Sequence, residues 1–189
     1  MRARAEAAAA TTRRILDATG ELFMESFLDV MTLDQVAARA GVTVPTVLKR
    51  FPGKEALIDA FATDLLGQVG ELRRAAPAGD VGQAVRVVLE DYERWGDLTI
   101  RALDQEERVP ALRAHVEAGK VLHRDWVRQV FGPQLSRRRG AGRARLEAQL
   151  LAVTDVYVWK LLRRDRGLDV HQTERALREL LDGVLGGGS

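Results

Sequence analysis

Residues 32 to 43 read TLDQVAARAGVT, and this stretch decides the fold. Thr32 and Gln35 have the spacing of a capping box, in which each side chain binds the other residue's backbone N–H at the start of a helix. The apolar positions of that helix end at Gly41, which can take the left-handed conformation of a tight turn. The stretch therefore predicts one short helix that ends in a glycine turn.

A second short helix is expected directly after this turn, from Val44 to Phe51. Thr43 stands at its N-cap position, and Pro45 is tolerated in the first turn because its missing N–H would have had no partner there. A supporting helix is expected before the pair, over residues 12 to 24, where apolar residues recur at helical spacing. Two short helices around a turn, with a supporting helix, form a helix-turn-helix, whose second helix enters the major groove of DNA.

The rest of the chain also has helical periodicity, so the predicted class is all-α. Pro52-Gly53 and the segment 76 to 79 are the clear breaks, and the arginine-rich stretch 137 to 145 is expected to be a mobile loop. Further helices are predicted over residues 54–74, 82–105, 110–131, 143–164 and 170–185. The expected domains are residues 1–58 for DNA binding, 59–185 for effector binding and dimerisation, and 186–189 as a flexible tail.

Composition limits the possible functions. The 189 residues include no cysteine, which excludes disulfides, thiolate metal sites and cysteine nucleophiles. The formal net charge is only +2, but basic residues gather in the first third of the chain. No segment has the length of a membrane span, so we expect a cytoplasmic protein with no membrane partner.

Individual residues around the motif resemble the N-terminal domain of the TetR family of transcriptional regulators. The resemblance covers about residues 13 to 58. It is carried by RILDA at 14–18, Leu22-Phe23, Thr32, Val36-Ala37, AGVT at 40–43, Thr46, Phe51 and KEAL at 54–57. It implies a homodimer that binds double-stranded DNA. The C-terminal domain is then expected to be helical, but it varies widely within the family and the resemblance does not identify its ligand.

The predicted DNA-contacting surface lies on one side of the second short helix and at the start of the next helix. Hydroxyl groups and cations there can bind phosphates or guanine, and aliphatic side chains can contact thymine methyl groups. The resemblance implies that the ammonium group of Lys54 binds a phosphate. The predicted DNA-binding residues are Thr32, Thr43, Val44, Pro45, Thr46, Leu48, Lys49, Arg50 and Lys54.

Three residues depart from the family pattern. Leu48 stands where a tyrosine usually contacts phosphate, Pro45 where glycine is frequent, and Phe27 where the turn usually has glycine. The loss of one phosphate hydrogen bond should weaken DNA binding by about 1 kcal/mol. We therefore expect an atypical operator. The basic N-terminal residues either form a flexible arm that reaches DNA or are simply solvated.

The C-terminal helices have the apolar pattern of an interface between two copies. The helix predicted over 143–164 is apolar almost all round, and the last helix carries one apolar stripe. Dimerisation through these two helices predicts an inverted-repeat operator, although both helices could instead be core of one chain. The predicted dimer residues are Leu151, Val158, Leu162, Leu177, Leu181 and Val184.

A small-molecule effector is expected to bind between helices that carry most of the aromatic residues. His123 lies on an apolar stripe, so it is either a core histidine with its hydrogen bonds satisfied or a pocket contact. The effector itself is not identified by the sequence. The predicted pocket residues are Tyr92, Trp95, Thr99, Leu103, His123, Trp126 and Tyr157.

The sequence predicts no enzyme, no cofactor and no metal site. The histidines at 115, 123 and 171 lack metal-ligand spacing, and no glycine-rich phosphate loop follows a strand. Two alternatives to a ligand-responsive repressor stay open. One is a helical ligand carrier or partner-binding protein without sequence-specific DNA binding, and the other is a constitutive DNA-binding dimer without an effector.

Overall fold

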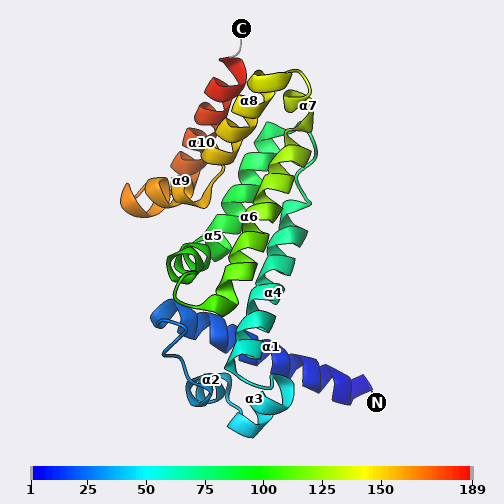
Figure 1. The fold of residues 1–189 in the computed structure, drawn as a ribbon, viewed down its shortest axis with the longest axis vertical. Coiled ribbons are helices and arrows are strands. Elements are labelled where there is room, and N and C mark those ends of the chain that lie inside the picture. Colours follow the sequence, from blue (N-terminus) through cyan, green and yellow to red (C-terminus); the bar gives the residue numbers. More distant parts are fainter. Residues whose placement is uncertain (1, 188–189) are drawn as a thin grey trace. The chain divides into compact units, whose positions relative to one another are not determined.

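The computed structural model describes residues 2–187, and every regular element in these residues is a helix, which confirms the all-α prediction. Figure 1 shows the order of the helices along the chain. The elements are α1 (Arg2–Glu25), α2 (Leu33–Ala40), α3 (Val44–Arg50), α4 (Lys54–Arg73), α5 (Val81–Gln105), α6 (Pro110–Val130), α7 (Gly132–Leu135), α8 (Gly140–Val153), α9 (Val156–Lys160), the π-helix η1 (Leu161–Asp165) and α10 (Val170–Gly186).

The chain forms two compact units. The first unit comprises residues 1–66 and 101–117, and the second comprises residues 67–100 and 118–189. The expected DNA-binding domain, residues 1–58, lies within the first unit, but that unit also includes the end of α5 and the start of α6. Two separate stretches of the chain therefore build the unit that carries the helix-turn-helix.

Helix α1 begins ten residues earlier than the sequence predicts, at Arg2 instead of Thr12. Alanine has the highest helix propensity, and the run Ala7 to Ala10 extends the helix toward the N-terminus. The hydroxyl group of Thr12 donates to the carbonyl of Ala8 within the same helix. The basic N-terminal residues from Arg2 onward therefore lie on a helix.

The core of the first unit is formed by the inner faces of its helices. Ile15 and Phe23 of α1, Val36 of α2 and Leu57 of α4 are all at most 1% exposed. The rings of Phe23 and Phe61 meet edge to face, with their centroids 6.3 Å apart. This packing holds α1 against α2 and α4, so the supporting helix has the place that the sequence predicted for it.

The prediction of a single helix over residues 143–164 is wrong. In the structure this segment forms three elements, α8, α9 and η1. The break lies at Thr154 and Asp155, and the backbone of Asp155 is extended. The carboxylate of Asp155 accepts a hydrogen bond from the backbone N–H of Tyr157 at 2.9 Å and so caps a new helix. The expected loop at 137–145 is also partly helical, because α8 begins at Gly140.

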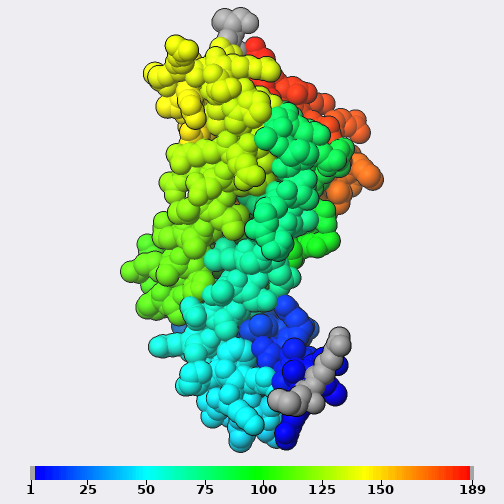
Figure 2. All heavy atoms as spheres, turned by 90° about the vertical axis from the view of Figure 1, so that its right-hand side faces the viewer, coloured from blue at the N-terminus to red at the C-terminus, as the bar shows by residue number. Residues whose placement is uncertain are grey.

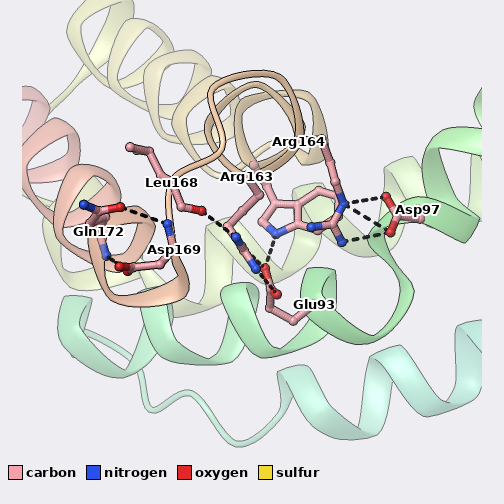
Figure 3. Close-up of polar contacts among 8 residues, drawn as sticks. Glu93, Asp97, Arg163, Arg164, Leu168, Asp169 and Gln172 are labelled. Atoms are coloured by element: carbon pink, nitrogen blue, oxygen red, sulfur yellow. Dashed lines mark hydrogen bonds and ion pairs between the residues drawn. The ribbon is translucent and has the colours of Figure 1, made fainter.

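Ion pairs and one indole ring attach α9 and η1 to α5 within the second unit (Figure 3). Arg163 binds both carboxylate oxygens of Glu93, and Arg164 binds Asp97 in the same way. The indole N–H of Trp159 donates to Glu93 at 2.8 Å. Trp159 packs so closely on Gly96 that a Cβ atom there would lie 2.5 Å from the ring.

Helix α10 starts at a capping box formed by Asp169 and Gln172. Leu177 and Leu181 are buried, and α10 packs against α8 within the same unit. Of the tail expected at 186–189, residues 188 and 189 lie outside the described residues, and Gly186 is the last residue of α10. Among the described residues, no helix is long and apolar enough to cross a membrane.

Candidate nucleic-acid interface

The turn between α2 and α3 has the predicted geometry. The backbone N–H of Gln35 donates to Thr32 Oγ1 at 3.2 Å, and the backbone N–H of Thr32 donates to Gln35 Oε1 at 2.8 Å. Gly41 has φ +63° and ψ +42°, a left-handed conformation that is costly for residues with a Cβ atom. The capping box and the glycine turn therefore fix both ends of α2.

Helix α3 is seated on the core by its apolar side. Val47 is fully buried and Phe51 is 7% exposed. Thr43 occupies the N-cap position of α3, but its side chain makes no capping hydrogen bond. Its hydroxyl group lies 2.9 Å from the hydroxyl of Thr46 instead. The hydroxyl pair forms one edge of the surface predicted to contact DNA.

The outer side of α3 is open to solvent. Pro45, Leu48 and Lys49 are exposed, and Leu48 is 44% exposed. Figure 2 shows residues of α3 and the start of α4, in cyan, as part of the outer surface of the first unit. Within residues 2–187, the ammonium group of Lys49 has no hydrogen bond or ion pair. This cation is available to an anion outside the chain.

The other two cations predicted to bind DNA are held by the protein itself. Arg50 Nη1 donates to the hydroxyl of Thr12 on α1 at 3.1 Å. Lys54 Nζ donates to the backbone carbonyl of Asp29 at 2.7 Å. An ammonium group has three donors, so Lys54 retains two for a phosphate. Arg50 ties α3 back to α1 through one of its five donors, so it also retains donors for a phosphate.

Exposed charges brace α2 against α1. Arg39 of α2 donates to Glu25 at 2.8 and 2.9 Å and to Glu21 at 3.2 Å. The hydrogen bonds from Arg39 lower the pKa of Glu25, and the hydrogen bonds from both glutamates raise the pKa of Arg39. Exposed pairs of this kind contribute little to stability, so they orient α2 more than they stabilise it.

Three of the predicted pocket residues lie around a buried arginine that the sequence pattern alone did not reveal. Arg73 is 4% exposed, and its guanidinium carbon lies 5.4 Å from the ring of Tyr92 and 5.0 Å from the ring of Trp126. Arg73 Nε donates to Asp91 at 2.6 Å, and Nη1 donates to Nδ1 of His123 at 2.6 Å. Burial raises the pKa of Asp91, whereas the charge of Arg73 opposes that shift.

A signal for this pair exists in the sequence. Arg73 continues an apolar stripe of α4 from Leu66 and Val69, and Asp91 lies on the stripe of α5 that includes Val88. A charged residue on an apolar stripe of each of two helices indicates a buried ion pair.

The other predicted pocket residues are more scattered. Trp95 and Thr99 are half-buried on α5, and the Thr99 hydroxyl donates to the carbonyl of Trp95. Tyr157 is 52% exposed on α9. Leu103 belongs to the first unit, so it does not share a unit with the other six. The structure thus gathers Tyr92, His123 and Trp126 around Arg73, and it places Leu103 in the other unit.

The residues predicted for a dimer interface also divide into two groups. Leu177 and Leu181 are at most 3% exposed within one chain, so they form part of its own core. Leu151, Val158, Leu162 and Val184 are half-buried. Large apolar side chains that are at least 39% exposed lie nearby in the sequence, namely Tyr157, Leu161, Val170 and Leu180.

Comparison with known proteins supports the interpretation of the first unit. Residues 15–61 match the model of the family described as bacterial regulatory proteins, tetR family. The N-terminal part of this chain is a TetR-family domain. The match lies within the α1 to α4 region that contains the turn at Gly41, and it confirms the resemblance found in the sequence.

A curated relative and several solved structures extend the comparison. An uncharacterized HTH-type transcriptional regulator of Mycobacterium tuberculosis is 31% identical over 99 residues, 51% of each chain, so this chain spans about half the length of the curated relatives it matches. A transcriptional regulator from Rhodococcus sp. Rha1 has a TM-score of 0.72 at 18% identity, covering 93% of this chain and 96% of that one.

FadR from Bacillus subtilis, solved in complex with stearoyl-CoA, has a TM-score of 0.69 at 14% identity, with 94% of this chain and 99% of that chain covered. The TetR-family regulator PfmR from Thermus thermophilus has a TM-score of 0.65 at 19% identity, with 93% and 99% covered. At these identities the likeness shows the fold alone, which this chain shares with these proteins over most of its length. The matched proteins are regulators and not enzymes, in agreement with the sequence prediction.

Proposed function

We propose that this chain is a transcriptional repressor that binds an inverted-repeat operator as a homodimer and is released by a small-molecule effector. The observation that carries the proposal is the outer face of α3, where exposed Leu48 and Lys49 stand on a helix seated by Val47. A two-fold dimer would present two such helices about one DNA turn apart, roughly 34 Å. Such a protein acts where DNA is, so the proposed location is the cytoplasm.

The proposed dimer surface combines the half-buried residues of the predicted interface with the exposed apolar residues near them. Tyr157, Leu161 and Leu180 are each at least 45% exposed. The contacts of Arg163 and Arg164 with α5 fix the segment that carries Tyr157 and Leu161. A fixed apolar surface can be covered by a second copy with little loss of conformational entropy.

The effector is proposed to act in the second unit, and fatty acyl-CoAs are the first candidates to screen. FadR from Bacillus subtilis shares this fold and was solved with stearoyl-CoA. An effector can release DNA only if it binds the two conformers of the dimer with different affinities. If no compound lowers operator affinity, the constitutive DNA-binding dimer becomes the better interpretation.

The decisive experiment selects binding sites from a randomised duplex library with the full-length protein. Enrichment of an inverted repeat supports a dimeric, sequence-specific regulator. Salt-sensitive binding without an enriched sequence contradicts the proposal and favours the helical carrier. In the described residues no three histidine, aspartate or glutamate side chains are placed to hold a metal ion, so the selection can be run in chelating buffer.

The Lys49→Ala variant is expected to bind the selected operator about tenfold more weakly, because a hydrogen bond to a charged group is worth about 1.5 kcal/mol. The slope of log K against log salt concentration is negative, and its magnitude should fall by about 1 for each Lys49 that contacts a phosphate. Fluorescence anisotropy at several salt concentrations measures both quantities. Lys120→Ala on α6 removes the same charge and should leave the slope unchanged.

The Leu48→Tyr variant is expected to bind about fivefold more tightly, since a hydroxyl group would restore a phosphate hydrogen bond worth about 1 kcal/mol. Leu48 is 44% exposed, so a larger ring can be accommodated without repacking the core. Leu48→Phe provides the ring without the hydroxyl. Equal affinities for the tyrosine and phenylalanine variants would show that position 48 does not face a phosphate.

A further inference from the structure

The turn between α1 and α2 carries Phe27, one of the three residues that depart from the family pattern. Its ring is 45% exposed, although its neighbours Leu28 and Met31 are buried. The turn is closed by hydrogen bonds from the backbone N–H groups of Val30 and Met31 to the carbonyl of Phe27. Because α2 begins directly after this turn, its conformation decides the direction in which α2 leaves α1.

The ring of Phe27 lies under two guanidinium groups from the end of α5 and the segment after it. The guanidinium carbon of Arg108 is 4.5 Å from the ring centroid, and that of Arg101 is 5.6 Å away. Both distances lie within the range of cation–π attraction. Arg101 also donates to the backbone carbonyl of Phe23 in the last turns of α1.

Residues from the same segment bind the backbone and the carboxylate of the turn. Gln105 is fully buried, and its Oε1 accepts the backbone N–H of Leu28 at 3.0 Å. Arg108 Nε donates to the carboxylate of Asp29 at 2.7 Å, and this hydrogen bond lowers the pKa of Asp29. Without Gln105, the N–H of Leu28 would be buried with no acceptor.

Asp29 is held from a second direction as well. Its backbone carbonyl accepts a hydrogen bond from Lys54 Nζ, at the start of α4. The turn is therefore bound both by the start of α4 and by the segment 101–108. The turn and these two segments all belong to the first unit. A single exposed ion pair contributes little to stability. Here, however, the carboxylate, a carbonyl, an N–H and a ring of the turn are all bound, and together these contacts restrict its conformation.

We propose that Arg108 and Gln105 are positioning residues for DNA binding, which hold the α1–α2 turn and so orient the helix-turn-helix without contacting DNA. The proposal rests on the proposed DNA-binding function of α3. It also accounts for Phe27, whose ring provides the surface on which the guanidinium group of Arg108 lies. The part of the chain needed for DNA recognition then includes residues 101–108, outside the segment matched by the family model.

The test compares operator binding by the wild-type chain and the full-length Arg108→Ala variant. Loss of an exposed ion pair and a cation–π contact should weaken binding about fivefold. The salt slope should stay at the wild-type value, because no phosphate contact is lost. Arg113→Ala, at an exposed position on the part of α6 that belongs to the same unit, removes the same charge and should bind within twofold of wild type.

A double-mutant cycle with Asp29→Ala adds a readout that general destabilisation would not produce. If Arg108 acts through Asp29, the double variant should bind no more weakly than the weaker single variant. Arg108→Lys should recover part of the loss, because it restores the charge near Asp29 but not the flat guanidinium group. Hydrogen exchange should become faster at residues 26–32 of Arg108→Ala and stay unchanged in α6.

Gln105→Leu keeps the buried volume and removes the acceptor of the Leu28 N–H. It should weaken operator binding more than Arg108→Ala and speed exchange of the Leu28 amide. The proposal is overturned if Arg108→Ala binds like wild type, if its salt slope falls as a phosphate contact would require, or if Arg113→Ala loses as much affinity. A wild-type chain that selects no operator would instead contradict the proposed function itself.

Discussion

The Arg73→Leu variant is expected to have a free energy of unfolding about 3 to 5 kcal/mol below that of the wild type. Arg73 and Asp91 side chains are 5% and 2% exposed, and their contact is 2.6 Å long. Removal of the arginine leaves a buried carboxylate without a cation and takes the hydrogen-bond donor from Nδ1 of His123. Urea denaturation followed by circular dichroism measures the change.

The double variant Arg73→Leu with Asp91→Leu provides the control for the pair. Because a buried ion pair can be replaced by apolar residues of similar size at little cost, most of the lost stability should return. Arg74→Leu alters the exposed neighbour, whose partner is Glu71, and should change stability by less than about 0.5 kcal/mol. A loss below about 1 kcal/mol for Arg73→Leu would mean that Asp91 is not desolvated.

The helix-turn-helix could be predicted because its determinants are local. The capping box of Thr32 and Gln35 and the left-handed Gly41 each depend on residues within a few positions. The apolar residues of α1 recur at helical spacing, so the supporting helix was also predictable, although its first turns were not. The alanines that extend α1 to Arg2 have helix propensity but no periodic pattern, and only propensity signals them.

The break after α8 has one local determinant, the Asp155 cap, but its other partner is distant in sequence, and apolar periodicity does not reveal it. The hydroxyl of Tyr92 donates to the carbonyl of Thr154 at 2.9 Å, across 62 residues. That carbonyl would otherwise accept a hydrogen bond within a continuous helix. An apolar pattern from 143 to 164 shows which residues can be buried, but it does not show that a side chain of α5 replaces a backbone donor.

The sequence predicts which basic residues the candidate site contains, but not which of them already bind acceptors within the protein. Lys49, Arg50 and Lys54 all lie on or next to α3 in the sequence. The acceptors that occupy Arg50 and Lys54 are Thr12 and the Asp29 carbonyl, 38 and 25 residues away. Sequence spacing within a motif cannot reveal such acceptors, so the separation of Lys49 from the other two cations required the structure.

The second unit is expected to lose stability as the pH falls from 7 to 5, by about 2 kcal/mol, because of His123. Burial, followed by the charge of Arg73, lowers the pKa of His123 to about 3 from its usual value of 6.5. The unfolded chain therefore binds a proton between pH 6.5 and 3 that the folded chain does not bind. Stability from this group is complete above pH 6.5 and decreases toward pH 3.

The groups around His123 explain why the folded state keeps it neutral. Arg73 of α4 donates to Nδ1, and Nε2 lies 3.3 Å from the hydroxyl of Thr154, which itself donates to the carbonyl of Leu150. The Thr154 oxygen can accept the remaining ring N–H. Asp91 already binds Arg73, and burial raises the pKa of Tyr92 to about 12, so neither residue offers a free carboxylate or phenolate to an imidazolium.

The His123→Asn variant separates this effect from the general acid sensitivity of the chain. The asparagine oxygen can accept the hydrogen bond from Arg73 at the position of Nδ1, and the residue does not titrate. Urea denaturation at pH 7 and pH 5 should show a decrease in stability for the wild type that is about 2 kcal/mol larger than for the variant. Parallel decreases in both proteins would mean that His123 is protonated in the folded state, and that Arg73 then donates its hydrogen bond elsewhere.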